Sequence, residues 1–100
     1  MTTTPERTFA FSIHGPIGRD DLPGLCTRVC ALLEANAAPV GLCDVRSVDV
    51  DAVTVDALAR LQLAARRRGC RVRLRNASPA LLDLVSFMGL TDVLPDEVLR

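Results

Sequence analysis

Hydrophobic and polar residues alternate with two different periods along this chain, and the two periods predict three strands and three helices. Residues 8–14 have a period of two, with Phe9, Phe11 and Ile13 on one face, as in a strand. Residues 40–45 (VGLCDV) form a short apolar run, typical of a parallel strand that is buried on both faces. Residues 71–75 (RVRLR) alternate strictly, which predicts a strand near the sheet edge with one apolar face and one arginine face.

Apolar positions at helical spacing predict a helix before the second strand and another after the third. For the first helix we expect Asp20 and Asp21 to supply the N-cap and the helix to end near Asn36. Its apolar stripe consists of Leu22, Leu25, Cys26, Val29, Leu32 and Leu33. The last helix is expected to start after the Ser78-Pro79 pair and to end at Gly89.

The middle helix is expected to begin with Thr54 as its N-cap and to run to about Arg68, with Gly69 just past its end. At about 100° per residue, its two faces separate clearly. The inner face holds Val55, Leu58, Leu61 and Ala65, with Gln62 at its margin, and the outer face holds Asp56, Arg60, Leu63 and Arg67.

The element order β-α-β-α-β-α predicts an α/β domain with a mostly parallel sheet and helices mainly on one face. A chain of 100 residues is long enough for one hydrophobic core. We expect a disordered tail over residues 1–7, a single domain over 8–95 and a C-terminal tail over 96–100. The first strand could lie uncovered at the sheet edge, which would allow two copies to pair as a homodimer.

Composition narrows the range of partners. Twelve basic residues balance twelve acidic ones, and there are three Phe but no Trp or Tyr. Nucleic-acid binding needs a basic excess or a set of stacking aromatics, so we expect no nucleic-acid partner. No apolar run approaches the roughly 18 residues of a membrane span, and the first residues do not resemble a signal peptide. The expected location is cytoplasmic, with no membrane partner.

Catalytic and metal-binding patterns are not found in the sequence. The four cysteines (Cys26, Cys30, Cys43 and Cys70) contain no C-x-x-C pair, and we expect them to serve as small core residues. His14 is the only histidine. Without a nucleophile–base set or a phosphate loop, the sequence predicts a protein that is not an enzyme and that uses no cofactor or metal.

Several segments resemble STAS domains, the family named for sulphate transporters and anti-sigma factor antagonists. The resemblance spans roughly residues 8–95. It rests on Gly15 and on four segments: 43–45 (CDV), 51–58 (DAVTVDAL), 66–72 (RRRGCRV) and 78–84 (SPALLDL) with 89–90 (GL). It implies a small bacterial signalling domain that regulates transcription by binding a protein, such as an anti-sigma factor kinase.

The family signature is an Asp, two small hydroxyl residues and a Gly at the start of the second helix, and the second hydroxyl is phosphorylated. When Asp51 is aligned with the family Asp, Ala52 and Val53 take the hydroxyl positions and Thr54 takes the glycine position. Since valine cannot accept phosphate, the resemblance implies a degenerate member without the usual serine switch. Thr54 is the neighbouring hydroxyl that a kinase could still modify, although an N-cap explains it more simply, and Ser47 lies nearby.

The resemblance and the helix pattern together predict a partner-binding surface in the loop 49–54 and the helix that follows. The expected contact residues are Asp49, Asp51, Thr54, Asp56, Arg60, Leu63 and Arg67. The alternative is a module that senses a small ligand or nucleotide through the free N–H groups at the helix start. Asp49, Asp51 and Asp56 would repel a phosphate there, so protein binding is the preferred hypothesis.

Overall fold

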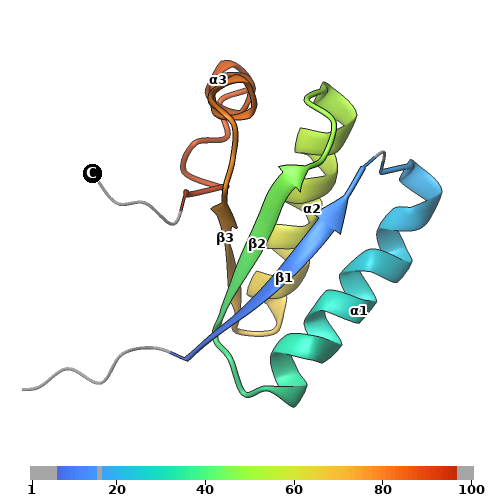
Figure 1. Ribbon diagram of the computed structural model, residues 1–100. Coiled ribbons are helices and arrows are strands. Elements are labelled where there is room, and N and C mark those ends of the chain that lie inside the picture. The colour runs from blue at the N-terminus through green and yellow to red at the C-terminus, as the bar shows by residue number, and fades with distance from the viewer. Residues whose placement is uncertain (1–6, 16, 97–100) are drawn as a thin grey trace, which may run out of the picture.

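The computed structural model describes residues 7–15 and 17–96, and it contains the six predicted elements in the predicted order (Figure 1). The strands are β1 (Thr8–His14), β2 (Val40–Ser47) and β3 (Arg71–Arg75). The helices are a short 3₁₀ turn, η1 (Arg19–Asp21), followed by α1 (Leu22–Ala35), α2 (Ala52–Arg67) and α3 (Pro79–Phe87).

The three strands form one parallel sheet in the order β1-β2-β3. Helices α1 and α2 lie on one face of this sheet, and α3 lies at the end where the strands finish (Figure 1). The predicted α/β class, with a parallel sheet and helices mainly on one face, is confirmed. The reason is the right-handed β-α-β connection, which returns each helix to the same side when successive strands are neighbours.

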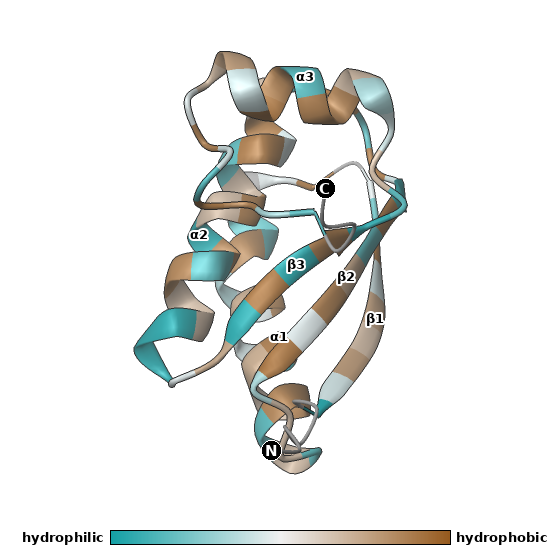
Figure 2. Ribbon diagram, turned by 90° about the vertical axis from the view of Figure 1, so that its left-hand side faces the viewer, coloured by the Kyte–Doolittle hydropathy of each residue, from teal (hydrophilic) through white to brown (hydrophobic). Residues whose placement is uncertain are grey.

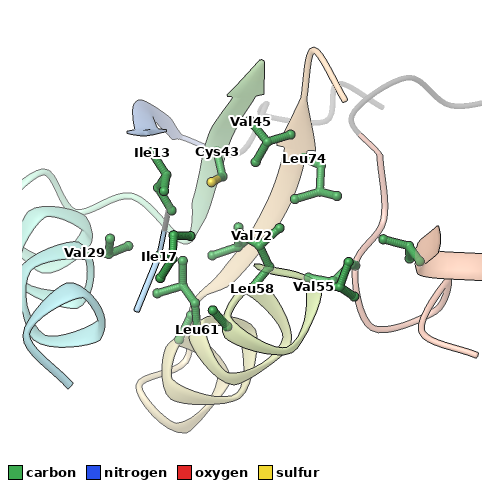
Figure 3. Close-up of a cluster of buried hydrophobic side chains, with 14 of the residues drawn as sticks. Ile13, Ile17, Val29, Cys43, Val45, Val55, Leu58, Leu61, Val72 and Leu74 are labelled. Atoms are coloured by element: carbon green, nitrogen blue, oxygen red, sulfur yellow. The ribbon is translucent and has the colours of Figure 1, made fainter. Parts of the chain in front are cut away.

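The core fills the space between the sheet and the two long helices. Cys43 of β2 and Leu74 of β3 are paired neighbours and belong, with Leu58 and Leu61 of α2, to the hydrophobic cluster of Figure 3. Phe11 of β1, which is paired with Cys43, is partly buried and packs against this cluster. Gly41 of β2 allows the close approach of its neighbours, because a Cβ at this position would lie 2.9 Å from Phe11 Cε1 and 3.0 Å from Leu33 Cδ2. The apolar face of each strand is thus packed against a helix.

Two sequence-based expectations about burial were wrong. β2 is not buried on both faces: Leu42 and Asp44, on the face opposite the helices, are only partly buried. The alternation predicted for β3 is confirmed: Val72 and Leu74 are buried between partly buried arginines, and Figure 2 shows the alternating hydropathy. In α1, Leu32, which was expected on the buried stripe, is 41% exposed, whereas Cys30 is buried as expected. The reason is that α1 lies beside the outermost strand, β1, where its far flank borders an open hollow.

α3 has the predicted chemistry at both ends, whereas α1 ends at Asn36 as predicted but lacks the predicted side-chain cap at its start. Ser78 Oγ accepts a hydrogen bond from Leu81 N (3.1 Å), and Gly89 ends the α3 segment with a φ of +74°. Asp21 occupies the N-cap position of α1 but makes no side-chain cap; its carboxylate instead accepts from Gly18 N at 3.2 Å. The intervening turn η1, which the sequence pattern did not predict, accounts for this difference.

Gln62 is a core residue rather than a marginal one. Its side chain is 1% exposed. Its Nε2 donates to the carbonyls of Val72 (2.7 Å) and Val93 (2.8 Å), and its Oε1 accepts from Val72 N (2.7 Å). Two buried hydrogen bonds therefore join α2 to β3, and a partly buried one joins α2 to the segment after α3.

The segment after α3 packs against the domain. Leu94 is buried, Pro95 O accepts from Leu74 N at 2.9 Å, and Asp96 forms a bridge with β3. The expected tails over residues 1–7 and 96–100 lie mostly outside the described residues. Within the described ranges, none of the helices has the length and apolar character needed to cross a membrane.

Candidate functional site

The loop between β2 and α2 is held in place by the loop that follows β1. Gly15 N donates to Ser47 O at 3.0 Å, and a Cβ at Gly15 would lie 2.8 Å from Asp49 N. Only glycine fits against backbone at that distance. The two loops therefore meet at the carboxyl ends of neighbouring parallel strands, where binding sites in α/β folds are usually formed.

Asp51, and not Thr54, is the N-cap of α2. The helix begins at Ala52, and Asp51 Oδ1 accepts from Thr54 N at 2.8 Å. The expectation that Thr54 would cap the helix was wrong, because a carboxylate three residues earlier already takes up that N–H. The Thr54 backbone N–H, with the Thr54 hydroxyl, holds the pKa of Asp51 below its ordinary value of 3.8.

Thr54 is inside the protein. Its exposed fraction is 1%, so its hydroxyl is offered neither to a kinase nor to a partner. This corrects its assignment as a contact residue and as a phosphorylation candidate. The neighbouring side chains face solvent instead: Asp49, Asp51 and Val53 are exposed, and Val53 carries no hydroxyl.

The outer face of α2 is arranged as its spacing predicted. Arg60 Nε donates to Asp56 Oδ2 at 2.9 Å, an i, i+4 ion pair on the surface. Leu63 is 49% exposed, and Arg67 is exposed. The structure thus brings together Asp56, Arg60, Leu63 and Arg67 on one surface.

This surface extends into a groove that the sequence did not reveal. Arg60, Leu63, Ala64 and Arg67 of α2 line a hollow of about 270 Å³ whose other wall comes from the first turns of α1. The wall residues are Leu22, Pro23 and Cys26. No local pattern could identify them, because they meet α2 only when α1 packs beside it. Val50, 46% exposed in the loop, was also missed.

Two of the cysteines are buried, as expected of core residues, and two are partly exposed. Cys30 and Cys43 are buried, while Cys26 and Cys70 are of intermediate exposure; all four are free thiols. Burial raises the pKa of Cys43 to about 12 and also raises the pKa of Cys26. At neutral pH the Cys26 thiol at the groove wall is therefore protonated, and it reacts slowly because the thiolate is the nucleophilic form.

A second polar group of residues lies at the ends of β1 and β2, on the other side of the loop. Ser12, His14, Asp44, Arg46 and Ser47 line a hollow of about 350 Å³ there. The Asp44 carboxylate makes hydrogen bonds within the protein: it accepts from Arg46 N (3.0 Å) and from Asn76 Nδ2 (3.1 Å). The bond from Arg46 N is the main reason that the pKa of Asp44 is lowered. Among residues 7–15 and 17–96, no group of three potential metal ligands comes together.

The comparisons with known proteins agree with this architecture. A family model described as "Mlab, STAS domain" matches residues 2–96, nearly the whole chain. The chain belongs to the STAS domain family. No curated protein matches it.

Two solved structures share the fold of this STAS domain at low sequence identity. The anti-sigma factor antagonist SpoIIAA in its unphosphorylated form has a TM-score of 0.63 and 14% identity, over 97% of this chain and 85% of that one. A sulfate transporter family protein from Wolinella succinogenes has a TM-score of 0.63 and 24% identity, over 93% of this chain and 75% of that one. The two likenesses establish the fold of this chain.

Proposed function

We propose that this STAS domain is a non-enzymatic interaction module that binds a regulatory protein partner through the loop 49–54 and the outer face of α2. One observation carries the proposal. Of the five large apolar side chains that are exposed in the described residues, three (Val50, Val53 and Leu63) lie in this loop or on this helix face. Apolar anchors surrounded by charged residues are typical of protein-binding surfaces.

The partner is bound without the serine switch. Val53 stands where the resemblance places the phosphoacceptor, and the neighbouring hydroxyl of Thr54 is buried. In a switched domain, a phosphate would add about two negative charges and disrupt docking. Here the side chain at that position is apolar and cannot be phosphorylated. Capture of the partner therefore depends on whether the partner is present and not on a kinase reaction at this loop.

An anti-sigma factor kinase in a bacterial transcription pathway is the partner class that the fold likeness to SpoIIAA favours. Such a partner would place this domain in the cytoplasm. Pairing of two copies through the β1 edge is a separate prediction, tested by light scattering, in which a strict monomer at high concentration would exclude it.

Affinity capture from the native cytosol, followed by mass spectrometry, tests the proposed surface. Leu63→Asp and Val53→Asp should each reduce recovery of the partner at least about tenfold, because each places a charge in the contact. The matched control is Leu32→Asp: Leu32 has a similar exposed fraction, 41% against 49% for Leu63, but it lines a different hollow, next to β1, and not the groove between α1 and α2.

All three variants should unfold within about 3 °C of the wild type, since all three side chains are partly exposed. Equal recovery with wild type and with both binding-face variants would refute the proposed surface. Recovery of an anti-sigma-type kinase would support the transcriptional assignment, whereas another partner would keep the module and discard that pathway.

A further inference from the structure

The groove between α1 and α2 combines an apolar interior with two arginines at its rim. Leu22, Pro23 and Cys26 form one wall, and Leu63 and Ala64 form the other. Arg60 and Arg67 also line it. They are seven residues apart on the helix, a separation of about 10 Å along its axis, with Leu63 and Ala64 between them.

The two arginines are available to a ligand. The described residues provide no ion pair or side-chain hydrogen bond for Arg67. Arg60 pairs with Asp56, but the side chains of both are largely in solvent, with exposed fractions of 62% and 49%. Exposed pairs of this kind are weak and readily exchanged. No carboxylate is among the residues that line the groove.

We infer that the groove receives an amphipathic helix of the partner that carries one large apolar side chain between two carboxylates. The apolar side chain enters between Leu63 and Cys26, and the carboxylates pair with Arg60 and Arg67. This rests on the proposed function and specifies its partner. Two adjacent helices form a groove in which a third helix can lie, and arginine pairs with carboxylates in a bidentate geometry. The groove volume of about 270 Å³ suits a single side chain rather than a whole ligand.

The proposal also fixes the spacing in the partner. Carboxylates about 10 Å apart on a helix are separated by seven residues, with the apolar residue three or four positions from each. A neutral or basic segment would leave Arg60 and Arg67 facing a desolvating surface without counter-charges, which costs binding energy.

Site-specific photo-crosslinking tests this inference with the full chain in its native cells. A benzoylphenylalanine introduced in place of Leu63 should form an adduct with one partner peptide, and that peptide should have acidic residues on both sides of the attached residue at helical spacing. The same probe in place of Leu32 should give no such adduct.

The Arg67→Glu change should lower the adduct yield at least about tenfold by like-charge repulsion, whereas Arg67→Lys should lower it less. Arg28→Glu, an exposed arginine of α1 outside the groove, is the matched charge control.

Protection of Cys26 gives an independent readout with the isolated complex. The bound helix should slow alkylation of Cys26, which lines the groove, but not of Cys70, a thiol of similar intermediate exposure that does not line it. Because the Cys26 thiol is neutral at pH 7, the reaction is best followed at about pH 8.5.

The outcomes separate this inference from the proposed function. The same photo-crosslinking probe is also introduced in place of Val53, in the loop before α2. Adducts from position 53 but not from position 63, or a position-63 adduct with a basic or uncharged peptide, would overturn the groove assignment and keep the binding surface. An adduct with a second copy of this chain would show that the groove binds another copy of the same protein, and would overturn the inference of a partner helix. No adduct from either position would refute both.

Discussion

The two faces of α2 carry similar leucines in opposite surroundings. Leu61 faces inward and is fully buried, whereas Leu63, two residues further on, is 49% exposed at the groove beside α1. The inner face also contains Gln62, whose three hydrogen bonds are all internal, and the outer face contains Arg60 and Arg67, which face solvent. The difference suggests that stability and recognition are divided between two sides of one helix, so that a change on one side should leave the other property intact.

The largest effect is expected from Leu61→Ala compared with Leu63→Ala. Leu61→Ala opens a cavity in the hydrophobic core and should lower the free energy of unfolding by about 3 kcal/mol. Leu63→Ala removes the same atoms from a half-exposed site and should lower it by no more than about 0.5 kcal/mol, while weakening partner capture. Urea denaturation of both variants measures the contrast. Similar losses would show that Leu63 is part of the core and that the two faces are not independent.

A smaller loss is expected from Gln62→Met, which keeps the volume of the side chain but removes its polar atoms. Val72 N–H and the carbonyls of Val72 and Val93 would lose their side-chain partners. The free energy of unfolding should fall by about 2 kcal/mol, because buried polar groups without partners are costly. Amide exchange of Val72 should accelerate more than that of Cys43. An unchanged free energy of unfolding in Gln62→Met would show that water takes over these hydrogen bonds and that Gln62 is not needed to join α2 to β3.

The smallest effect concerns the N-cap of α2 and depends on pH. The folded pKa of Asp51 is lowered below 3.8 by the Thr54 N–H, so the carboxylate contributes stability above its unfolded pKa of about 3.9 and loses it as pH falls through the folded value. Asp51→Asn keeps an acceptor but does not titrate. The stability of the wild type relative to this variant should therefore be constant from pH 8 to about pH 5 and then fall.

Denaturation midpoints of the two proteins at successive pH values measure this difference. Asp44, whose pKa is also lowered, is common to both proteins and cancels in the comparison. A difference that stays constant down to pH 2 would show that Asp51 does not cap the helix as a carboxylate.

Local sequence patterns predicted most of the fold because the relevant interactions are local. β1 and β3 have the predicted bounds, the Ser78-Pro79 pair begins α3, and Gly69 follows α2 with a φ of +77°. The start of α2 was misplaced because Asp51 and Thr54 are both good caps, and the choice between them depends on which side chain the core buries. Thr54 is buried against the sheet, and Asp51 remains at the surface where its carboxylate can cap the helix.

The side of the candidate site that α2 and the loop before it contribute was also predictable from local sequence patterns. Helical periodicity alone places Arg60, Leu63 and Arg67 on one face of α2, and a family resemblance identifies the loop before it. The second wall of the groove consists of residues some forty positions earlier, and the pattern of α1 suggested only that Leu22 and Cys26 would be core. They are partly exposed because α1 lies at one edge of a three-stranded sheet and its first turns do not fully close against α2.

The sequence by itself determined the element order, the parallel sheet and the two faces of α2, because each follows from the period of apolar residues and from turn chemistry within a few positions. Only the tertiary structure decided that Gln62 is internal, that Thr54 is buried and that Cys26 faces Leu63. Each of these depends on which surfaces meet when helices pack on the sheet, and that packing is set by long-range contacts that no local pattern encodes.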